Sequence, residues 1–356
     1  MEAFINGIGI ISPQRSLGRK DFLLVPVDYK QNYLRCIEPE YDRLIPAQHL
    51  RRMSRILRMG TAAATMAVQE ASIAKPDAII TGTGYGCLED TATFLSQISA
   101  LKESALNPTP FMQSTHNTIG SQIALVLQCT GYNQTYVHGA CSFEHAVLDA
   151  MMHLSENPEL NILTGGIDEW TPSRHAVESR FSKYRREVTG TLGLLDTSEK
   201  GTVAGEGAVY FVLSGAESAN SIASVRGVRT FSDLAPGEVA EKVSGFLSDS
   251  KIEKSDVDLV LTGKTGDLSV DGKMNVVIDL FNHSSVGAFK HLCGEYSVAS
   301  SFAVALAAAT FEQQHIPDVV LLRNMHRTLD TILIHNSYFQ DQHTLILLQR
   351  CQPGKN

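Results

Sequence analysis

The chain has 356 residues, a formal net charge of −8 at pH 7 and a sequence pI near 5.8. This acidic balance argues against nucleic-acid binding, which needs concentrated Lys and Arg to neutralise phosphates. Hydrophobic residues make up 43% of the chain but occur only in short runs, so the composition predicts a soluble globular protein without a membrane span.

The N-terminus and the cysteines indicate the compartment. Residues 1–7 lack the basic start and the long apolar stretch of a signal peptide, which predicts a cytoplasmic protein. The six cysteines are scattered and include no C-x-x-C pair. This pattern predicts reduced thiols rather than a disulfide framework or a metal site.

Strand-like and helix-like segments alternate in the first half of the chain. Short β-branched and aromatic runs predict strands at 4–8, 78–81, 134–138, 161–164 and 208–213. Between the first two of these, the alanine-rich segment 53–71 is apolar at helical spacing. It is therefore expected to form a buried helix.

The second half repeats this pattern, with strands predicted at 223–228, 259–262, 275–278, 319–322, 331–335 and 344–348. A predicted helix at 298–311 begins after Gly294, much as a helix after Cys141 begins beyond Gly139. The chain is therefore predicted to be an α/β protein with an internal duplication, divided into residues 1–215 and 216–356 near the polar stretch 214–221. Two halves that share one continuous core are the alternative.

Cys141 is the first candidate for chemistry. A strand-like run ends just before it, and apolar residues at helical spacing follow it. A helix N-terminus offers N–H groups and partial positive charge, which lower a thiol's pKa and can hold an oxyanion. The alternative is a buried cysteine that only packs.

Short motifs along the chain carry a family resemblance. They are Phe4-Ile-Asn-Gly-Ile-Gly-Ile-Ile-Ser12, Arg51-Arg-Met-Ser-Arg55, Ile80-Thr-Gly-Thr-Gly-Tyr-Gly86, Phe111-Met-Gln-Ser-Thr-His-Asn-Thr-Ile-Gly120, the Gly139-Ala-Cys-Ser142 turn, Gly165-Gly-Ile-Asp-Glu169 and Gly205-Glu-Gly-Ala-Val209. Taken in order, they resemble the condensing enzymes of the β-ketoacyl-acyl-carrier-protein synthase (ketosynthase) family over nearly the whole chain. The resemblance implies a thiolase-like fold, in which two duplicated α/β halves form a layered α-β-α-β-α sandwich.

The resemblance also implies a chemistry. In that family the cysteine accepts an acyl chain from the phosphopantetheine arm of an acyl carrier protein, and two histidines promote decarboxylation of a malonyl extender. It therefore implies that Cys141 is the acyl acceptor. No cofactor or metal is expected to be bound, and acyl groups are expected to arrive on the phosphopantetheine of the carrier protein.

The family's two histidines are missing from their expected positions. The first is replaced by Gly263 or Lys264, and the second, five residues after Lys290, is replaced by Glu295. A shifted alignment brings in His291 but loses the lysine and the glycine that anchor the match. An ionised Glu295 would repel a developing enolate, whereas Lys264 could supply positive charge. The alternative for Lys290 and Glu295 is a structural ion pair at a helix start.

Other departures and candidates concern the surroundings of the cysteine. The stretch 336–343 contains no glycine, although the family carries a glycine-rich loop there. His116 either faces the acyl pocket or, with Asn117, caps and packs a helix near the subunit interface. His138 and His145 flank Cys141, so each either tunes the thiol or is an ordinary packed histidine.

Three functions remain open from the sequence. The favoured one is a divergent ketosynthase-like subunit, comparable to the chain-length factors that pair with a complete ketosynthase in polyketide and aryl-polyene systems. The second is a self-sufficient acyltransferase or condensing enzyme that uses Cys141 with unconventional partners. The third is an inert dimerisation module. The fold resemblance implies a homodimer, or a heterodimer with a complete ketosynthase through the same surface.

Overall fold

The computed structural model describes residues 2–16, 22–197, 199–235, 237–325, 328–339 and 342–351. In the first half the elements are β1 (Ala3–Ile11), η2 (Tyr41–Arg43), α1 (Ala47–Leu50), α2 (Arg55–Glu70), β2 (Ala78–Gly82), α3 (Leu88–Leu101), α4 (Pro108–Gln113), α5 (Thr118–Leu127), β3 (Asn133–Tyr136), η3 (Gly139–Cys141), α6 (Ser142–Glu156), β4 (Asn161–Asp168), α7 (Pro172–Arg180) and β5 (Gly207–Ser214). In the second half they are β6 (Ala223–Ser232), α8 (Glu238–Asp249), η4 (Lys254–Asp256), β7 (Leu259–Thr262), α9 (Leu268–Asp279), β8 (Ser285–Ala288), α10 (Lys290–Cys293), α11 (Ser300–Gln313), β9 (Leu321–Arg323), β10 (Thr331–Tyr338) and β11 (Gln342–Arg350).

The strands confirm the duplication. They form one sheet in the order β3-β2-β4-β5-β1-β6-β11-β10-β7-β8-β9. In the first half β2 runs parallel to β3 and β4, while β5 runs antiparallel to β4 and β1. In the second half β7 runs parallel to β8 and β10, while β11 runs antiparallel to β10 and β6. The two halves are therefore equivalent in topology and are joined where β1 pairs with β6.

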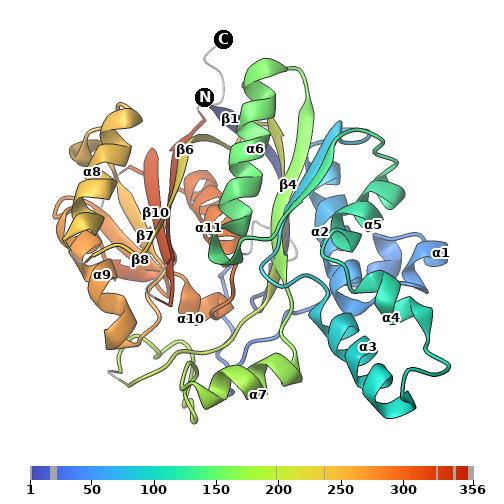
Figure 1. Ribbon diagram of the computed structural model, residues 1–356. Coiled ribbons are helices and arrows are strands. Elements are labelled where there is room, and N and C mark those ends of the chain that lie inside the picture. Colours follow the sequence, from blue (N-terminus) through green and yellow to red (C-terminus); the bar gives the residue numbers. More distant parts are fainter. Residues whose placement is uncertain are drawn as a thin grey trace.

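Five layers result from this arrangement (Figure 1). Helices α6 and α11 lie between the two halves of the sheet, α2 and α5 cover the outside of the first half, and α8 and α9 cover the outside of the second. The central core combines residues of both halves, including Ile5, Phe302 and Leu348, so the halves share one continuous core. The α/β sandwich expected from the motifs is confirmed, and the domain division at residue 215 stays a prediction.

Most predicted elements are found, and two predictions need correction. Residues 275–278 are not a strand but lie within α9, whose N-cap is Asp267; the Asp267 side chain accepts the N–H of Ser269 at 2.9 Å. The short run Val276-Val277-Ile278 looked like a strand, but Met274 and Val277 are buried at helical spacing. Strand β8 was missed because its four residues, Ser-Val-Gly-Ala, carry little strand signal.

A glycine with positive φ precedes each of the two central helices, α6 and α11. Gly139, with φ +56°, precedes the Cys141 turn, and Gly294, with φ +76°, ends α10. A Cβ on Gly294 would lie 2.5 Å from the Ala204 carbonyl oxygen, so only glycine fits there. Among the described residues, no helix combines the length and the apolar character needed to cross a membrane.

Candidate active site

Cys141 lies at the predicted strand-to-helix turn, as the last residue of η3 and the residue before α6. Its side chain is buried, with only 3% of the residue exposed. The Cys141 N–H donates to the His138 carbonyl oxygen at 3.1 Å, and the Ser142 N–H donates to Gly139. The Ala140 N–H donates to the side-chain oxygen of Gln342 at 2.9 Å. The backbone donors of this turn are therefore engaged within the protein.

The thiol is neutral at physiological pH. The pKa of Cys141 is raised to about 12, chiefly by burial and also by the nearby Glu144 carboxylate, while the nearby Thr230 hydroxyl partly lowers it. The lowering expected from the helix N-terminus is therefore not found. Cys141 therefore needs a proton acceptor before it can attack a thioester.

Glu144 is a site residue that the sequence analysis missed. It is fully buried on α6, one helical turn after Cys141, and neither carboxylate oxygen has a partner in hydrogen-bonding geometry. Burial raises its pKa to about 7, while the nearby hydroxyls of Ser300 and Thr344 and the charge of Lys290 lower it. The available sequence signal was an acid inside the apolar helical stripe after the nucleophile, where a buried charge is rare.

Lys290 and Glu295 form an ion pair. The Lys290 Nζ lies 2.7 Å from Glu295 Oε2 and also donates to the Ser337 carbonyl oxygen at 2.7 Å, and both side chains are fully buried. Burial raises the pKa of Glu295, although Lys290 partly offsets this. The position of the family's second histidine therefore holds half of a buried pair rather than an imidazole, as the structural alternative predicted.

Lys264 and His291 point elsewhere. The Lys264 Nζ donates to Asn275 Oδ1 on α9 at 3.0 Å, at the surface of the chain. The His291 ring lies 2.8 Å from the Val319 carbonyl oxygen, and burial lowers its pKa to about 4. These contacts direct neither side chain toward the thiol of Cys141.

His116 lies on the surface of the described chain. Its side chain is exposed and packs against Gly86, where an added Cβ would lie 2.7 Å from His116 Cδ2. Asn117 precedes α5 without a side-chain capping bond, so the expected capping role is not found. The structure does not join His116 to Cys141.

His138 and His145 do connect to the nucleophile turn. The two Nδ1 atoms lie 3.1 Å apart, and the His145 Nε2 lies 3.3 Å from the Thr230 hydroxyl on β6. The Thr230 hydroxyl lies close enough to the Cys141 thiol to lower its pKa. The chain from Cys141 through Thr230 to the histidines was not predicted, because Thr230 is 89 residues away in sequence from Cys141.

A second buried histidine pair faces away from Cys141. The His335 Nε2 on β10 lies 3.2 Å from the His343 Nδ1 on β11. Both alternate with the inward-facing Ile334 and Ile346, so they share the sheet face that packs against α8 and α9. Burial lowers the pKa of His335 to about 3. These imidazoles therefore lie across the sheet from the thiol.

The segment 336–343 forms the end of β10 and the start of β11, and Gln340 and Asp341 within it lie outside the described residues. The segment contacts α7 and the loop that follows it. The Tyr338 hydroxyl bonds to the Arg174 guanidinium at 3.1 Å, and the Lys183 ammonium lies 4.2 Å from the centre of the Phe339 ring. Where the family has glycines, this chain thus anchors large side chains.

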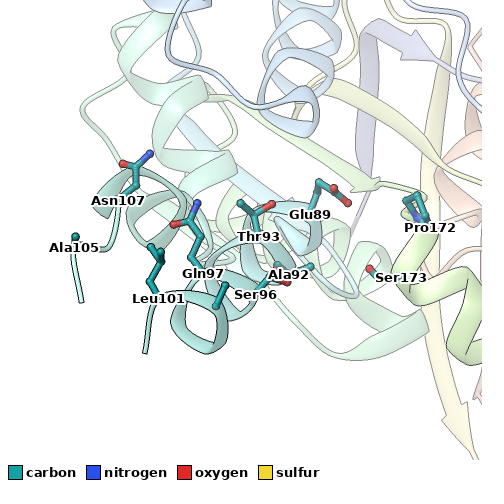
Figure 2. Close-up of a pocket in the computed structure, with 11 residues that line it drawn as sticks. Glu89, Ala92, Thr93, Ser96, Gln97, Leu101, Ala105, Asn107, Pro172 and Ser173 are labelled. Atoms are coloured by element: carbon teal, nitrogen blue, oxygen red, sulfur yellow. The ribbon is translucent and has the colours of Figure 1, made fainter. Parts of the chain in front are cut away.

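A hollow of about 660 Å³ lies away from the thiol, along α3 and the start of α7. Figure 2 shows Thr93, Gln97 and Leu101 lining it from the helix, with Ser173 on the other side. Its lining contains neither a thiol nor a histidine. It offers no group for acyl transfer, so the candidate active site remains at Cys141.

A sequence profile of the β-ketoacyl synthase N-terminal domain matches residues 27–219. The chain belongs to the β-ketoacyl synthase family. No curated protein matches the sequence.

Solved structures share the fold over the full length. "The ishigamide ketosynthase/chain length factor" aligns with a TM-score of 0.80 and 19% identity, covering 99% of both chains. A chain from a ketosynthase (ApeO) in complex with its chain length factor (ApeC) from Xenorhabdus doucetiae aligns with a TM-score of 0.75 and 15% identity, covering 98% of both chains. A β-ketoacyl synthase from Burkholderia phymatum aligns with a TM-score of 0.78 and 14% identity, covering 99% of this chain and 100% of that one. These similarities confirm the thiolase-like ketosynthase fold.

Proposed function

We propose that this protein is a chain-length-factor-like subunit that pairs with a complete ketosynthase and handles acyl chains carried on the phosphopantetheine of an acyl carrier protein. The pathway class is fatty acid, polyketide or polyene synthesis. Structures of the same fold include a ketosynthase with its chain length factor and a type II polyketide carrier protein with its ketosynthase, which supports both partners.

The buried Lys290–Glu295 pair carries this proposal. Decarboxylative condensation needs hydrogen-bond donors at the developing enolate oxygen, and losing one such donor typically costs about 2.7–4 kcal/mol. Here the second histidine position holds Glu295, whose partner Lys290 is already engaged, and Lys264 bonds to α9. With neither imidazole available at these positions, condensation by this chain alone is expected to be very slow, and the partner is expected to supply it.

The surface beside strand β3 supports the subunit pairing. β3 is the last strand of the sheet, so its outer edge is unpaired in the isolated chain. Apolar side chains stay exposed around it, including Leu125 on α5, Val137 after β3, and Met152 on α6, which are 66%, 46% and 53% exposed. An open sheet edge with apolar flanks favours a second subunit at this place.

The experiment uses the purified full chain, alone and mixed with a candidate ketosynthase partner. We expect incubation of the chain alone with acyl- and malonyl-loaded carrier protein to give an acyl adduct on Cys141 by intact mass, without release of carbon dioxide. Release of carbon dioxide by the chain alone would favour the self-sufficient enzyme instead. An unacylated thiol, together with product length and yield that do not change in Cys141→Ala, would favour the inert module.

A further inference from the structure

Acyl uptake by Cys141 requires a group that accepts the proton of the thiol. The thiol is buried and neutral, so its proton must leave when the sulfur attacks a thioester carbon. Water has little access to a residue that is 3% exposed. The proton acceptor must therefore be a protein group in contact with the sulfur or joined to it by hydrogen bonds.

We propose that Thr230, His145 and His138 form the path by which Cys141 gives up its proton during acyl uptake, an inference that rests on the proposed function of Cys141. Thr230 lies next to the reacting thiol and 3.3 Å from His145 Nε2, so the two histidines act through it. The path runs from the buried thiol to His138, which is exposed in the isolated chain. It joins the nucleophile turn, strand β6 and helix α6.

The hydrogen bonds determine the role of each ring nitrogen of His145. Burial and the neighbouring His138 lower the pKa of His145, so this imidazole is neutral near pH 7. Its Nε2 faces the Thr230 hydroxyl at 3.3 Å and is free to accept a proton when Nδ1–H donates to the His138 Nδ1 at 3.1 Å. This arrangement matches the general design of a nucleophile, a base and a third group that orients the base, with Thr230 inserted between the first two.

The step balances as a proton-coupled acyl transfer. The Cys141 sulfur forms a bond to the thioester carbon as its proton passes to the Thr230 oxygen, and the Thr230 proton passes to His145 Nε2. The carbon–sulfur bond to phosphopantetheine then breaks. The imidazolium of His145 returns the proton through Thr230 to the departing thiolate, so the carrier protein leaves with a free thiol and no other reactant is needed.

Glu144 is the rival acceptor. Its carboxylate lies close enough to raise the pKa of the thiol, and Lys290 lies close enough to influence the carboxylate. However, the carboxylate lies near Ser300 on α11 and Thr344 on β11, whereas Thr230 lies next to the thiol and 3.3 Å from His145 Nε2. The geometry therefore favours the threonine path, and a Glu144→Gln variant separates the two.

The experiment compares the initial rate of Cys141 acylation in the full chain between pH 6 and 9. The probe is the hexanoyl thioester of N-acetylcysteamine, which mimics the end of the phosphopantetheine arm, and the adduct is measured by intact mass. We expect Thr230→Val and His145→Gln to slow acylation at pH 7 by about a hundredfold or more, the usual range for general base catalysis. Thr230→Ser should retain the rate, since it keeps the hydroxyl. His153→Gln is the matched control, because His153 lies on α6 beside Asp149 and Tyr132, away from the thiol.

Alkylation by iodoacetamide supplies a readout that does not depend on acyl transfer. Because the Thr230 hydrogen bond lowers the thiol pKa, Thr230→Val should shift the pH profile of Cys141 alkylation upward, while Thr230→Ser should not. Equal acylation rates in the wild type, Thr230→Val and His145→Gln would overturn the path and leave acyl uptake intact. A rate that falls only in Glu144→Gln would assign the proton to Glu144 and overturn it as well. A wild-type chain that never forms the adduct would refute acyl uptake by Cys141, and the path with it.

Discussion

The buried carboxyl of Glu144 makes a quantitative prediction about stability. Its pKa rises from 4.5 to about 7 in the folded protein, chiefly because burial disfavours the charge. A tenfold change in proton affinity corresponds to about 1.4 kcal/mol, so the ionised carboxyl weakens folding by about 3 kcal/mol above pH 7. Glu144→Gln keeps the shape of the side chain and removes the charge.

The sign follows from the direction of the pKa change. A carboxyl that holds its proton more tightly when folded stabilises the protein fully below its unfolded pKa of 4.5 and loses that contribution as the pH rises through about 7. Glu144→Gln should therefore be more stable than the wild type by about 3 kcal/mol at pH 8 and nearly equal to it at pH 4.5. Urea unfolding of both proteins at pH 4.5, 6, 7 and 8, followed by circular dichroism, measures this difference.

Glu295→Gln is the matched control that tests whether the gain in stability at pH 8 arises because the carboxyl of Glu144 is unpaired. Glu295→Gln removes a carboxylate of equal burial that is paired with Lys290, so it should destabilise the protein at pH 8 rather than stabilise it. If Glu144→Gln were less stable than the wild type at pH 8, or differed from it equally at every pH, the account of Glu144 as an unpaired buried charge would be refuted.

Three further outcomes are expected. Lys290→Met should cost about 3–5 kcal/mol in urea unfolding because it leaves Glu295 charged and buried, whereas the double variant with Glu295→Leu should recover most of that loss; equal losses in both would contradict the pairing. Val137→Arg should weaken association with the ketosynthase partner by about tenfold or more in sedimentation or calorimetry while leaving the isolated chain folded, and unchanged affinity would place the interface elsewhere. Asp267→Ala should cost about 1–2 kcal/mol, since its carboxylate caps α9 and accepts the Gly201 N–H at 2.6 Å. Burial raises the pKa of Asp267, but the hydrogen bonds from Ser269 and Gly201 outweigh it and the pKa is lowered, so this loss should shrink as the pH falls below the unfolded value of 3.8.

The fold was predictable because its signals are local. Short β-branched and aromatic runs predicted most strands, and the turn at Cys141 was recognisable from a strand-like run followed by apolar residues at helical spacing. The wrong strand prediction also came from a local signal. Residues 276–278 are β-branched, but the capping carboxylate of Asp267 and the buried Met274 favour a helix, and the four-residue window 275–278 contains neither.

The site was harder to predict because its contacts are distant in sequence. The position of Cys141 followed from its own neighbours, but the groups that set its chemistry come from β6, α11 and β11. Glu144 was visible only as an acid in an apolar stripe. Its surroundings depend on Ser300 on helix α11 and Thr344 on strand β11, which only the tertiary fold brings close. Lys290 and Glu295, five residues apart at a glycine turn, are the exception, and their pairing was one of the two alternatives that the sequence offered.

The charges around Cys141 favour the proposed acyl uptake over condensation. One buried cation, Lys290, lies near two buried carboxyls, Glu144 and Glu295, so the surroundings carry a negative charge whenever both are ionised. A second negative charge on an enolate would be opposed by both carboxylates in a low-dielectric interior. In the proposed acyl transfer, the negative charge that develops on the thioester oxygen is matched by the positive charge that His145 gains through Thr230. The proton then returns to the departing thiolate, so no net charge is added to the site. The retained cysteine and the missing family histidines thus fit one division of labour, in which this subunit receives an acyl chain and its partner extends it.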